Sequence, residues 1–146
     1  MNTELRDKAL NLLSYRAHSR RELSVKLKQK TDCTEQDLAE VLDWLEELDF
    51  LNDRTYAASV VRHLASKGYG RSRITAELSR RGIDRDLWDE ALTEMPDTAG
   101  TLDRLIRSKL KATEDRDEIL KVSAAMVRRG YSWDEVRQAI DRMIHV

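Results

Sequence analysis

The sequence has little of what a β-rich, disulfide-bonded or membrane-spanning protein needs. Its 146 residues include one cysteine, one proline and five glycines. So few glycines and prolines argue against a turn-dense β protein, and a single cysteine excludes an internal disulfide and fits a reducing compartment. No apolar run approaches the roughly 18 residues needed to span a bilayer, and the first residues lack a signal-peptide core. We therefore expect a cytoplasmic protein that does not contact the membrane.

Charge is abundant but nearly balanced, since charged residues make up 36% of the chain and the net charge is −1. The two signs are nevertheless segregated along the sequence. Residues 34–49 contain seven acids and no Lys or Arg, whereas residues 71–85 contain five arginines and two acids. Such segregation is typical of a surface that binds a partner with a complementary charge pattern, and it is also typical of helix faces that are simply exposed to solvent. Charge alone leaves both interpretations open.

Apolar residues recur with a helical period, and this is clearest between Leu51 and Asp84. Tyr56, Val60 and Leu64 fall four residues apart and form one apolar face. Glycines at 68 and 70 end this helix, and a second helix runs to a glycine at 82. A third helix is expected to open at Asp84. No single helix of this kind can bury its face alone, so the pattern predicts three helices packed together.

The same unit recurs before and after this stretch. The segment Leu78–Gly82 matches Met126–Gly130 at an offset of 48 residues, including an Arg-Arg-Gly run, and Leu27 matches Leu78 at an offset of 51. A near-constant period of this size is typical of helical repeat arrays. The sequence therefore predicts an all-α fold of three tandem three-helix repeats that form an elongated, curved array. The repeats are expected at residues 1–50, 51–96 and 97–146.

Helix boundaries are marked by side chains that can cap a helix N-terminus. Ser19 with Glu22, and Ser132 with Glu135, form capping boxes, and Thr34 with Asp37 resembles one. Either Asn52 or Asp53 can cap the helix that carries Tyr56. Other helices are expected over Glu4–Arg16, which buries Leu5, Ala9, Leu12 and Leu13; from Asp84, with Trp88, Ala91, Leu92 and Met95 inside; over Thr98 to about Ala112; and over Arg116–Arg129. The stretch Lys111–Asp117 is the loosest part of the third repeat.

The sequence offers little that could be catalytic. His18, His63 and His145 each stand alone, without a second ligand at helical spacing, and Cys33 has no histidine near it in the sequence. The chain also lacks the G-x-x-x-x-G-K-[ST] loop that binds nucleotide phosphates. We therefore expect no enzyme activity, no metal site and no cofactor.

Eight arginines are the candidate contact residues for a protein partner or a nucleic acid. Arginines at helix C-termini complement the helix dipole, so a structural role and a binding role are equally open for that half of the set. Arginines in a first turn are disfavoured by roughly 0.3–1 kcal/mol, and there they can create an anion site for a carboxylate or a phosphate. The first-turn residues are Arg20, Arg21, Arg71 and Arg73, and the C-terminal residues are Arg80, Arg81, Arg128 and Arg129.

Several of these motifs resemble the RecX family of recombination regulators. The resemblance rests on RAHSRRELSVKLKQK at Arg16–Lys30, followed by LNDRTYAASVV, KGYG and ITAELSRRGI between Leu51 and Ile83. It covers the first two repeats well and the third mainly in helix layout. The chain departs from the family pattern at Lys30-Thr31, where Lys-Gly is frequent, and at Tyr56, where Phe is common.

The resemblance implies tandem three-helix repeats that bind the RecA–single-stranded DNA filament. It also implies that they limit ATP hydrolysis, strand exchange and filament growth, in homologous recombination, DNA repair and the SOS response. Contacts with single- or double-stranded DNA through the basic second helices remain open, and we expect a monomer.

Two other classes of protein compete with this interpretation. Three-helix units also build helix-turn-helix DNA-binding domains, and charge-rich helical repeats often serve as general interaction scaffolds. Groove reading would place the third helix of a unit against DNA phosphates. In the first repeat that helix carries seven acids and no bases, so the charge pattern counts against sequence-specific DNA recognition.

Overall fold

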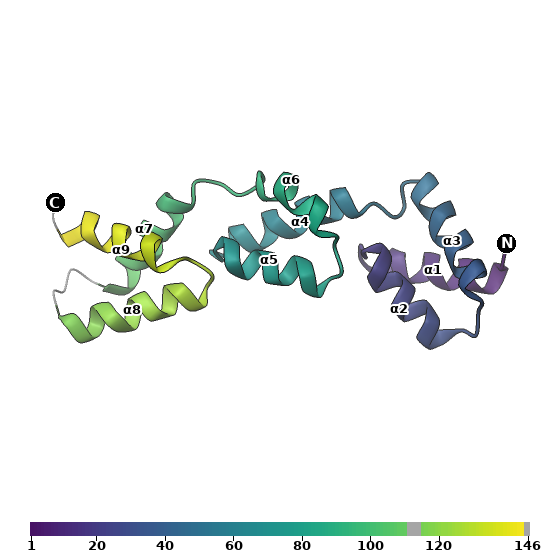
Figure 1. The fold of residues 1–146 in the computed structure, drawn as a ribbon, viewed down its shortest axis with the longest axis horizontal. Coiled ribbons are helices and arrows are strands. Elements are labelled where there is room, and N and C mark those ends of the chain that lie inside the picture. Colours follow the sequence, from purple (N-terminus) through teal and green to yellow (C-terminus); the bar gives the residue numbers. More distant parts are fainter. Residues whose placement is uncertain (111–114, 145–146) are drawn as a thin grey trace. The chain divides into compact units, whose positions relative to one another are not determined.

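A computed structural model describes residues 1–110 and 115–144 of the chain. Within these ranges the protein consists of nine α-helices and one short 3-10 helix, without a strand (Figure 1). The all-helical prediction is therefore confirmed. None of the helices described is both long and apolar enough to cross a membrane.

The helices follow one another with short connections. In order they are α1 (Thr3–Tyr15), α2 (Arg20–Lys30), α3 (Glu35–Glu47), α4 (Asp53–Ser66), α5 (Arg71–Arg80), the 3-10 helix η1 (Arg85–Leu87), α6 (Trp88–Leu92), α7 (Thr98–Leu110), α8 (Arg116–Arg128) and α9 (Trp133–Ile144). The expected helix end near Ala112, most of the loose stretch Lys111–Asp117, and His145 lie outside the described residues.

Helix starts follow the predicted caps. Ser19 Oγ accepts the backbone N–H of Glu22 at 3.0 Å, and the Glu22 carboxylate accepts the N–H of Ser19 at 3.0 Å. The Ser132 box has the same two bonds, at 3.1 and 3.0 Å. At α4 the cap is Asn52, whose Oδ1 accepts the N–H of Thr55 at 3.1 Å. Asp53 is thus left for another role, described below.

The chain divides into two compact units, which are described separately. The first comprises Met1–Ser59 with Leu78–Ala91, and the second comprises Val60–Glu77 with Leu92–Val146. Helices α4 and α5 contribute residues to both units.

The core of the first unit lies among α1, α2 and α3. The stripe Leu38, Val41, Leu42 and Leu45, whose spacing in the sequence fits one face of a helix, is fully or almost fully buried in α3. Each buried leucine stabilises the fold by roughly 1.5–3 kcal/mol. Leu12 and Leu13 were expected inside, but they are half-buried and pack at the margin of this core. The buried residues are Leu5, Ala9, Leu23, Leu27, Leu38, Val41, Leu42, Leu45 and Leu51.

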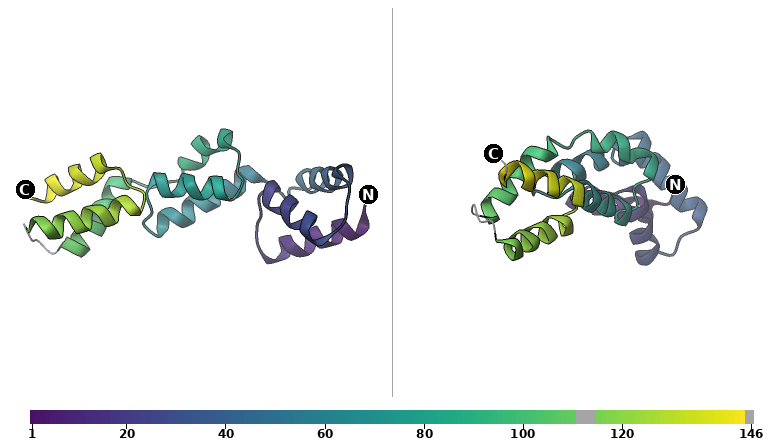
Figure 2. Two further views of the ribbon diagram at one scale, coloured as in Figure 1. Left: turned by 60° about the horizontal axis from the view of Figure 1, so that its bottom comes forward. Right: turned by 60° about the vertical axis from the view of Figure 1, so that its left-hand side comes forward.

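The core of the second unit lies among α7, α8 and α9, which pack against one another in every view (Figure 2). Leu120, which is part of the apolar pattern of α8, is 53% exposed. The buried residues are Leu102, Ile106, Leu110, Val122, Met126, Tyr131, Val136, Ala139 and Ile140.

The helix predicted to open at Asp84 is shorter and less buried than expected. Asp84 caps η1, and α6 ends at Leu92 after five residues. Ala91 and Leu92 are buried as predicted, but Trp88 and Met95 are only half-buried, and Met95 lies beyond the helix end. Proline disfavours the α conformation in the residue before it, so Pro96 keeps Met95 out of a helix. The Trp88 indole N–H donates to the carbonyl of Ile83 at 3.0 Å, which fixes the ring on its own turn.

Candidate partner-binding surface

The eight candidate arginines lie at two helix-end contacts. At the α2 junction, the N-terminus of α2 with Arg20 and Arg21 meets the turn at Arg81–Gly82. At the α5 junction, the N-terminus of α5 with Arg71 and Arg73 meets the turn at Arg129–Gly130. Arg80 and Arg128 directly precede these two turns. In each case the second helix of one repeat begins beside the end of the second helix of the next repeat: α2 beside the end of α5, and α5 beside the end of α8.

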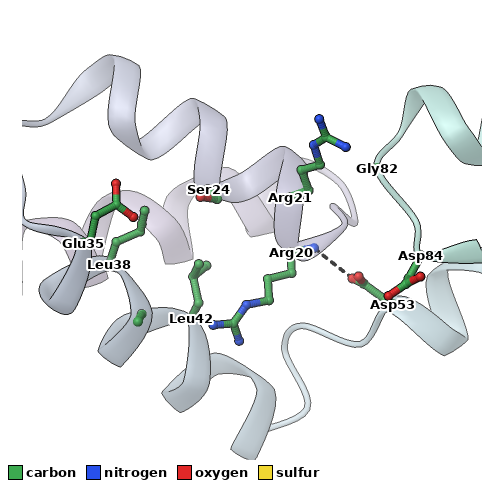
Figure 3. Close-up of a pocket in the computed structure, with 10 residues that line it drawn as sticks. Arg20, Arg21, Ser24, Glu35, Leu38, Leu42, Asp53, Gly82 and Asp84 are labelled. Carbon is green, nitrogen blue, oxygen red and sulfur yellow. Dashed lines mark hydrogen bonds between the residues drawn. The ribbon is translucent and has the colours of Figure 1, made fainter.

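At the α2 junction, partners from other parts of the chain contact the first turn of α2. Ser19 is buried and its hydroxyl donates to the carbonyl of Arg81. The N–H of Arg20 donates to Asp53 Oδ1 at 2.8 Å, drawn as the dashed line in Figure 3. Gly82 has φ +74°, and a Cβ there would lie 2.6 Å from the Arg21 side chain. The anion expected at this helix N-terminus is therefore a carboxylate of the chain itself.

The Arg20 side chain also has internal partners. Its guanidinium donates to Asp43 Oδ1 at 2.8 Å and to Glu46, two of the acids of α3. Burial lowers the pKa of Arg20, but the bonds to Glu46 and Asp43 outweigh this and raise it above its ordinary value. Figure 3 shows Arg20 directed toward α3 beside Leu42, whereas Arg21 points the other way. The first-turn position of Arg20 predicts a cation that stability disfavours, but this pairing with α3 supplies stabilising partners that the sequence does not reveal.

Tyr56, the residue that departs from the family pattern, uses its hydroxyl at this junction. The oxygen accepts from Arg81 at 2.9 Å and from Arg16 at 3.3 Å, and Arg16 also pairs with Glu22 at 3.1 Å. Burial raises the pKa of Tyr56. Burial also acts to raise the pKa of Glu22, but hydrogen bonds from the Ser19 backbone and from Arg16 outweigh it and lower that pKa. A phenylalanine would leave both arginines without this acceptor.

A shallow groove of about 390 Å³ lies between α2 and α3, next to the α2 junction (Figure 3). It has both acidic and basic walls, and burial raises the pKa of Asp53 at its edge. The corresponding positions of α8 and α9 line a second groove of about 240 Å³, which includes Trp133. The first groove is lined by Arg20, Arg21, Ser24, Glu35, Leu38, Ala39, Leu42, Asp53, Gly82 and Asp84.

The α5 junction uses backbone groups where the α2 junction uses side chains. The N–H groups of Gly70 and Ser72 donate to the carbonyls of Arg129 at 2.8 Å and Gly130 at 3.1 Å. A Cβ at Gly70 would lie 2.5 Å from the Gly130 carbonyl carbon, so the two backbones touch. The buried Tyr131 hydroxyl donates to the carbonyl of Gly68 at 2.9 Å.

The cations of the α5 junction contact an aromatic ring and a carbonyl. The guanidinium carbons of Arg73 and Arg129 lie 5.0 and 5.6 Å from the ring centre of Tyr69. Arg129 also donates to the carbonyl of Lys67 at 3.1 Å. No carboxylate in the described part of the chain pairs with either arginine. Their positive charge is therefore not neutralised within the unit.

Of the two histidines among the described residues, His18 is buried and His63 is exposed. The Nδ1 of His18 lies 3.0 Å from the Arg16 carbonyl and its Nε2 lies 2.9 Å from the Lys26 ammonium. Since a carbonyl only accepts and an ammonium only donates, Nδ1 carries the proton and the ring is neutral. Burial lowers the pKa of His18. Among the described residues, no group of three His, Cys, Asp or Glu side chains could hold a metal ion.

Comparison with known proteins identifies the family of the chain. Residues 6–45 match the family model of the first three-helix domain of RecX, and residues 52–92 match that of the second. The regulatory protein RecX of Chlorobaculum tepidum is 33% identical over 138 residues, covering 92% of this chain and 84% of that protein. This chain belongs to the RecX family. The RecX of Escherichia coli K12 is 28% identical over 151 residues, covering 92% of this chain and 88% of that protein.

Solved RecX structures agree with the fold. The crystal structure of RecX from Lactobacillus salivarius matches with a TM-score of 0.87 and 27% identity, covering 99% of this chain and 97% of that one. A second crystal structure of a regulatory protein RecX, 24% identical, matches in fold with a TM-score of 0.82 over 94% of this chain and 72% of that one. The RecX fold of tandem three-helix domains and a regulatory role are thus shown for this chain, whereas the repeat boundaries at 50/51 and 96/97 remain predictions.

Proposed function

We propose that this chain inhibits the RecA recombinase by binding the RecA–single-stranded DNA filament in the cytoplasm. It limits ATP hydrolysis, strand exchange and filament growth, and so acts in homologous recombination, DNA repair and the SOS response. Membership in the RecX family carries this proposal, because its curated members are named regulatory proteins. The role is that of a non-catalytic binding protein, and the chain acts as a monomer.

The arginines at the two junctions supply the contact surface in this proposal. Guanidinium groups bind carboxylates and phosphates in a planar, two-pronged geometry, and a RecA filament on DNA offers both. Contacts of this type weaken as salt rises, since exposed charges are screened within about 8 Å at physiological ionic strength.

The direct test is single-stranded-DNA-dependent ATP hydrolysis by RecA with sub-stoichiometric amounts of the chain, with strand exchange as a second measurement. Inhibition is expected well below one chain per RecA protomer, because blocking a growing filament end affects many subunits. Undiminished hydrolysis and exchange at equimolar chain would contradict the proposal.

The residues are tested by two variants that separate contact from stability. The triple variant of Arg21, Arg71 and Arg73 to Ala should fold like the parent and lose most of the inhibition. Arg20→Ala should instead lose about 0.5–1 kcal/mol of unfolding free energy, the usual size for a partly exposed ion-pair network. Full inhibition by a folded triple variant would move the contact to Arg80, Arg81, Arg128 and Arg129.

A further inference from the structure

The two junctions have corresponding positions but differ in how their arginines are paired. At the α2 junction Arg20 is paired with Asp43 and Glu46, and the helix N-terminus is occupied by Asp53. At the α5 junction, Arg73 and Arg129 contact only an aromatic ring and a backbone carbonyl within the described residues. Exposed Arg128 and Lys67 add charge to this surface. At this junction Arg73 and Arg129 therefore keep their positive charge without a carboxylate partner among the described residues.

The guanidinium groups of this junction are held in place before any ligand binds. Arg73 and Arg129 both contact the Tyr69 ring, and Arg129 also donates to the Lys67 carbonyl, so these contacts restrict both arginine side chains. Each arginine has five N–H donors, so these contacts leave most donors free for an anion. A preordered cation loses less side-chain entropy on binding than a mobile one.

From this arrangement we infer that the α5 junction is a nucleic-acid-binding site, which takes the phosphates of a DNA strand through Arg73, Arg128 and Arg129. The inference concerns the chain by itself and does not depend on RecA. The corresponding α2 junction does not share this role, because its carboxylates would repel the same phosphates.

The surroundings favour DNA phosphates over an acidic protein surface. Protein–protein contacts are anchored by large apolar or aromatic side chains that become fully desolvated. None of the large hydrophobic side chains that the structure shows as exposed lies in this junction. Polar, strongly positive surfaces without such anchors are typical of DNA contacts.

The test is fluorescence anisotropy with a labelled oligo-dT strand of about 30 nucleotides, a length that accommodates several binding sites. It uses the parent and the Arg73, Arg128, Arg129 to Ala triple variant without RecA. Each single-strand phosphate contact contributes about 0.7 to the slope of log affinity against log salt, so the slope of the variant should be shallower by about 2. Between about 50 and 200 mM salt, the parent should therefore lose roughly 15-fold more affinity than the variant does.

A matched control removes three other cations from the same unit. Arg107, Arg116 and Lys121 are exposed on α7 and α8, and none has a hydrogen bond or ion pair among the described residues. The variant with these three changed to Ala should keep the parental affinity and slope. Equal weakening by both triple variants would overturn the inference, because net charge rather than this site would then govern binding. Parental dT binding by the Arg73, Arg128, Arg129 variant would overturn it as well.

A single charge reversal covers the case in which the triple variant unfolds, as circular dichroism would show. Arg128→Glu leaves both Tyr69 contacts intact and should weaken dT binding by about tenfold at low salt. Unchanged binding by this folded variant would overturn the site. If the parent inhibits RecA but does not bind dT, the inference fails and the proposed function stands. If the parent binds dT but does not inhibit RecA, the proposed function fails and the inference stands. A triple variant that binds dT normally but no longer inhibits RecA would show that the junction contacts protein instead.

Discussion

Gly70 and Gly100 are both in or next to helices, yet they have different surroundings. A Cβ on Gly70 would lie 2.5–2.7 Å from backbone atoms of Gly130 and Tyr131. These atoms cannot move without separating the start of α5 from the turn that follows α8. At Gly100, inside α7, the nearest atom would be a side-chain oxygen of Asp97 at 3.3 Å. Gly70 is therefore required by close backbone contact, whereas Gly100 is not.

We predict that the same substitution has opposite effects at the two sites. Gly70→Ala should destabilise the fold by about 2–3 kcal/mol, because rigid backbone must be displaced. Gly100→Ala should stabilise it by about 0.5–1 kcal/mol, the ordinary gain of replacing glycine in a helix. Urea unfolding of both variants measures this. Equal effects would mean that the backbone contact at Gly70 is not maintained in solution.

Single residues could be predicted where their role is local. The caps at Ser19 and Ser132 were visible because a serine and a glutamate three residues later act on the same turn. The partners of Arg20 were not predictable, because Asp43 and Glu46 lie 23 and 26 residues away and only the packing of α3 on α2 brings them close. The acceptor role of Tyr56 was hidden for the same reason.

At the scale of helices, the two capping boxes allow a comparison within one chain. Ser19 and Ser132 make the same two cap bonds. Ser19 is also fully buried and donates to the carbonyl of Arg81, whereas Ser132 is exposed. The difference between the two sites therefore reports the contribution of the α2 junction.

We expect Ser132→Ala to cost about 1 kcal/mol of unfolding free energy, as for an exposed helix cap. Ser19→Ala should cost about 1 kcal/mol more, because it leaves the partly buried carbonyl of Arg81 without its donor. Thermal or urea unfolding of both variants distinguishes the two costs. If the costs are the same, the bond from Ser19 to Arg81 contributes nothing to stability.

Helix order and core stripes followed from periodicity, but helix lengths and contacts between repeats did not. The stripe Leu38, Val41, Leu42 and Leu45 is buried as its spacing predicted. The corresponding pattern from Trp88 to Met95 gives only a five-residue helix, since Pro96 and the Trp88 bond to Ile83 act against it. The junctions were missed because periodicity shows that repeats exist and not which of their ends meet.

At the scale of the whole chain, acid should reduce stability first through His18. Its pKa is lowered by burial, beside the cations Arg16 and Lys26 and the carboxylate Glu22. A histidine with a lowered pKa stabilises the fold fully above its unfolded pKa of about 6.5, and this contribution declines as pH falls toward the folded value. The Glu22 pKa is also lowered, but its contribution is lost only below about pH 4.5.

The unfolding free energy of the parent should therefore fall between about pH 7 and pH 5.5, by at most about 1.4 kcal/mol per pH unit for one proton, and its urea midpoint should fall with it. His18→Gln has no titrating ring, so its midpoint should be nearly constant over this range. A variant with the same decline as the parent would place the pH sensitivity elsewhere in the chain.

The junction geometry also has a consequence for how such a chain can grow. At each junction, groups at the start of the second helix of one repeat donate to carbonyls at the end of the second helix of the next repeat. An inserted copy of the repeat would therefore carry both the donors and the acceptors of this contact. At the start of α8, the side chain of Asp115 accepts the N–H of Asp117. Gene duplication can therefore add modules upstream of α8 that already carry both sides of this contact.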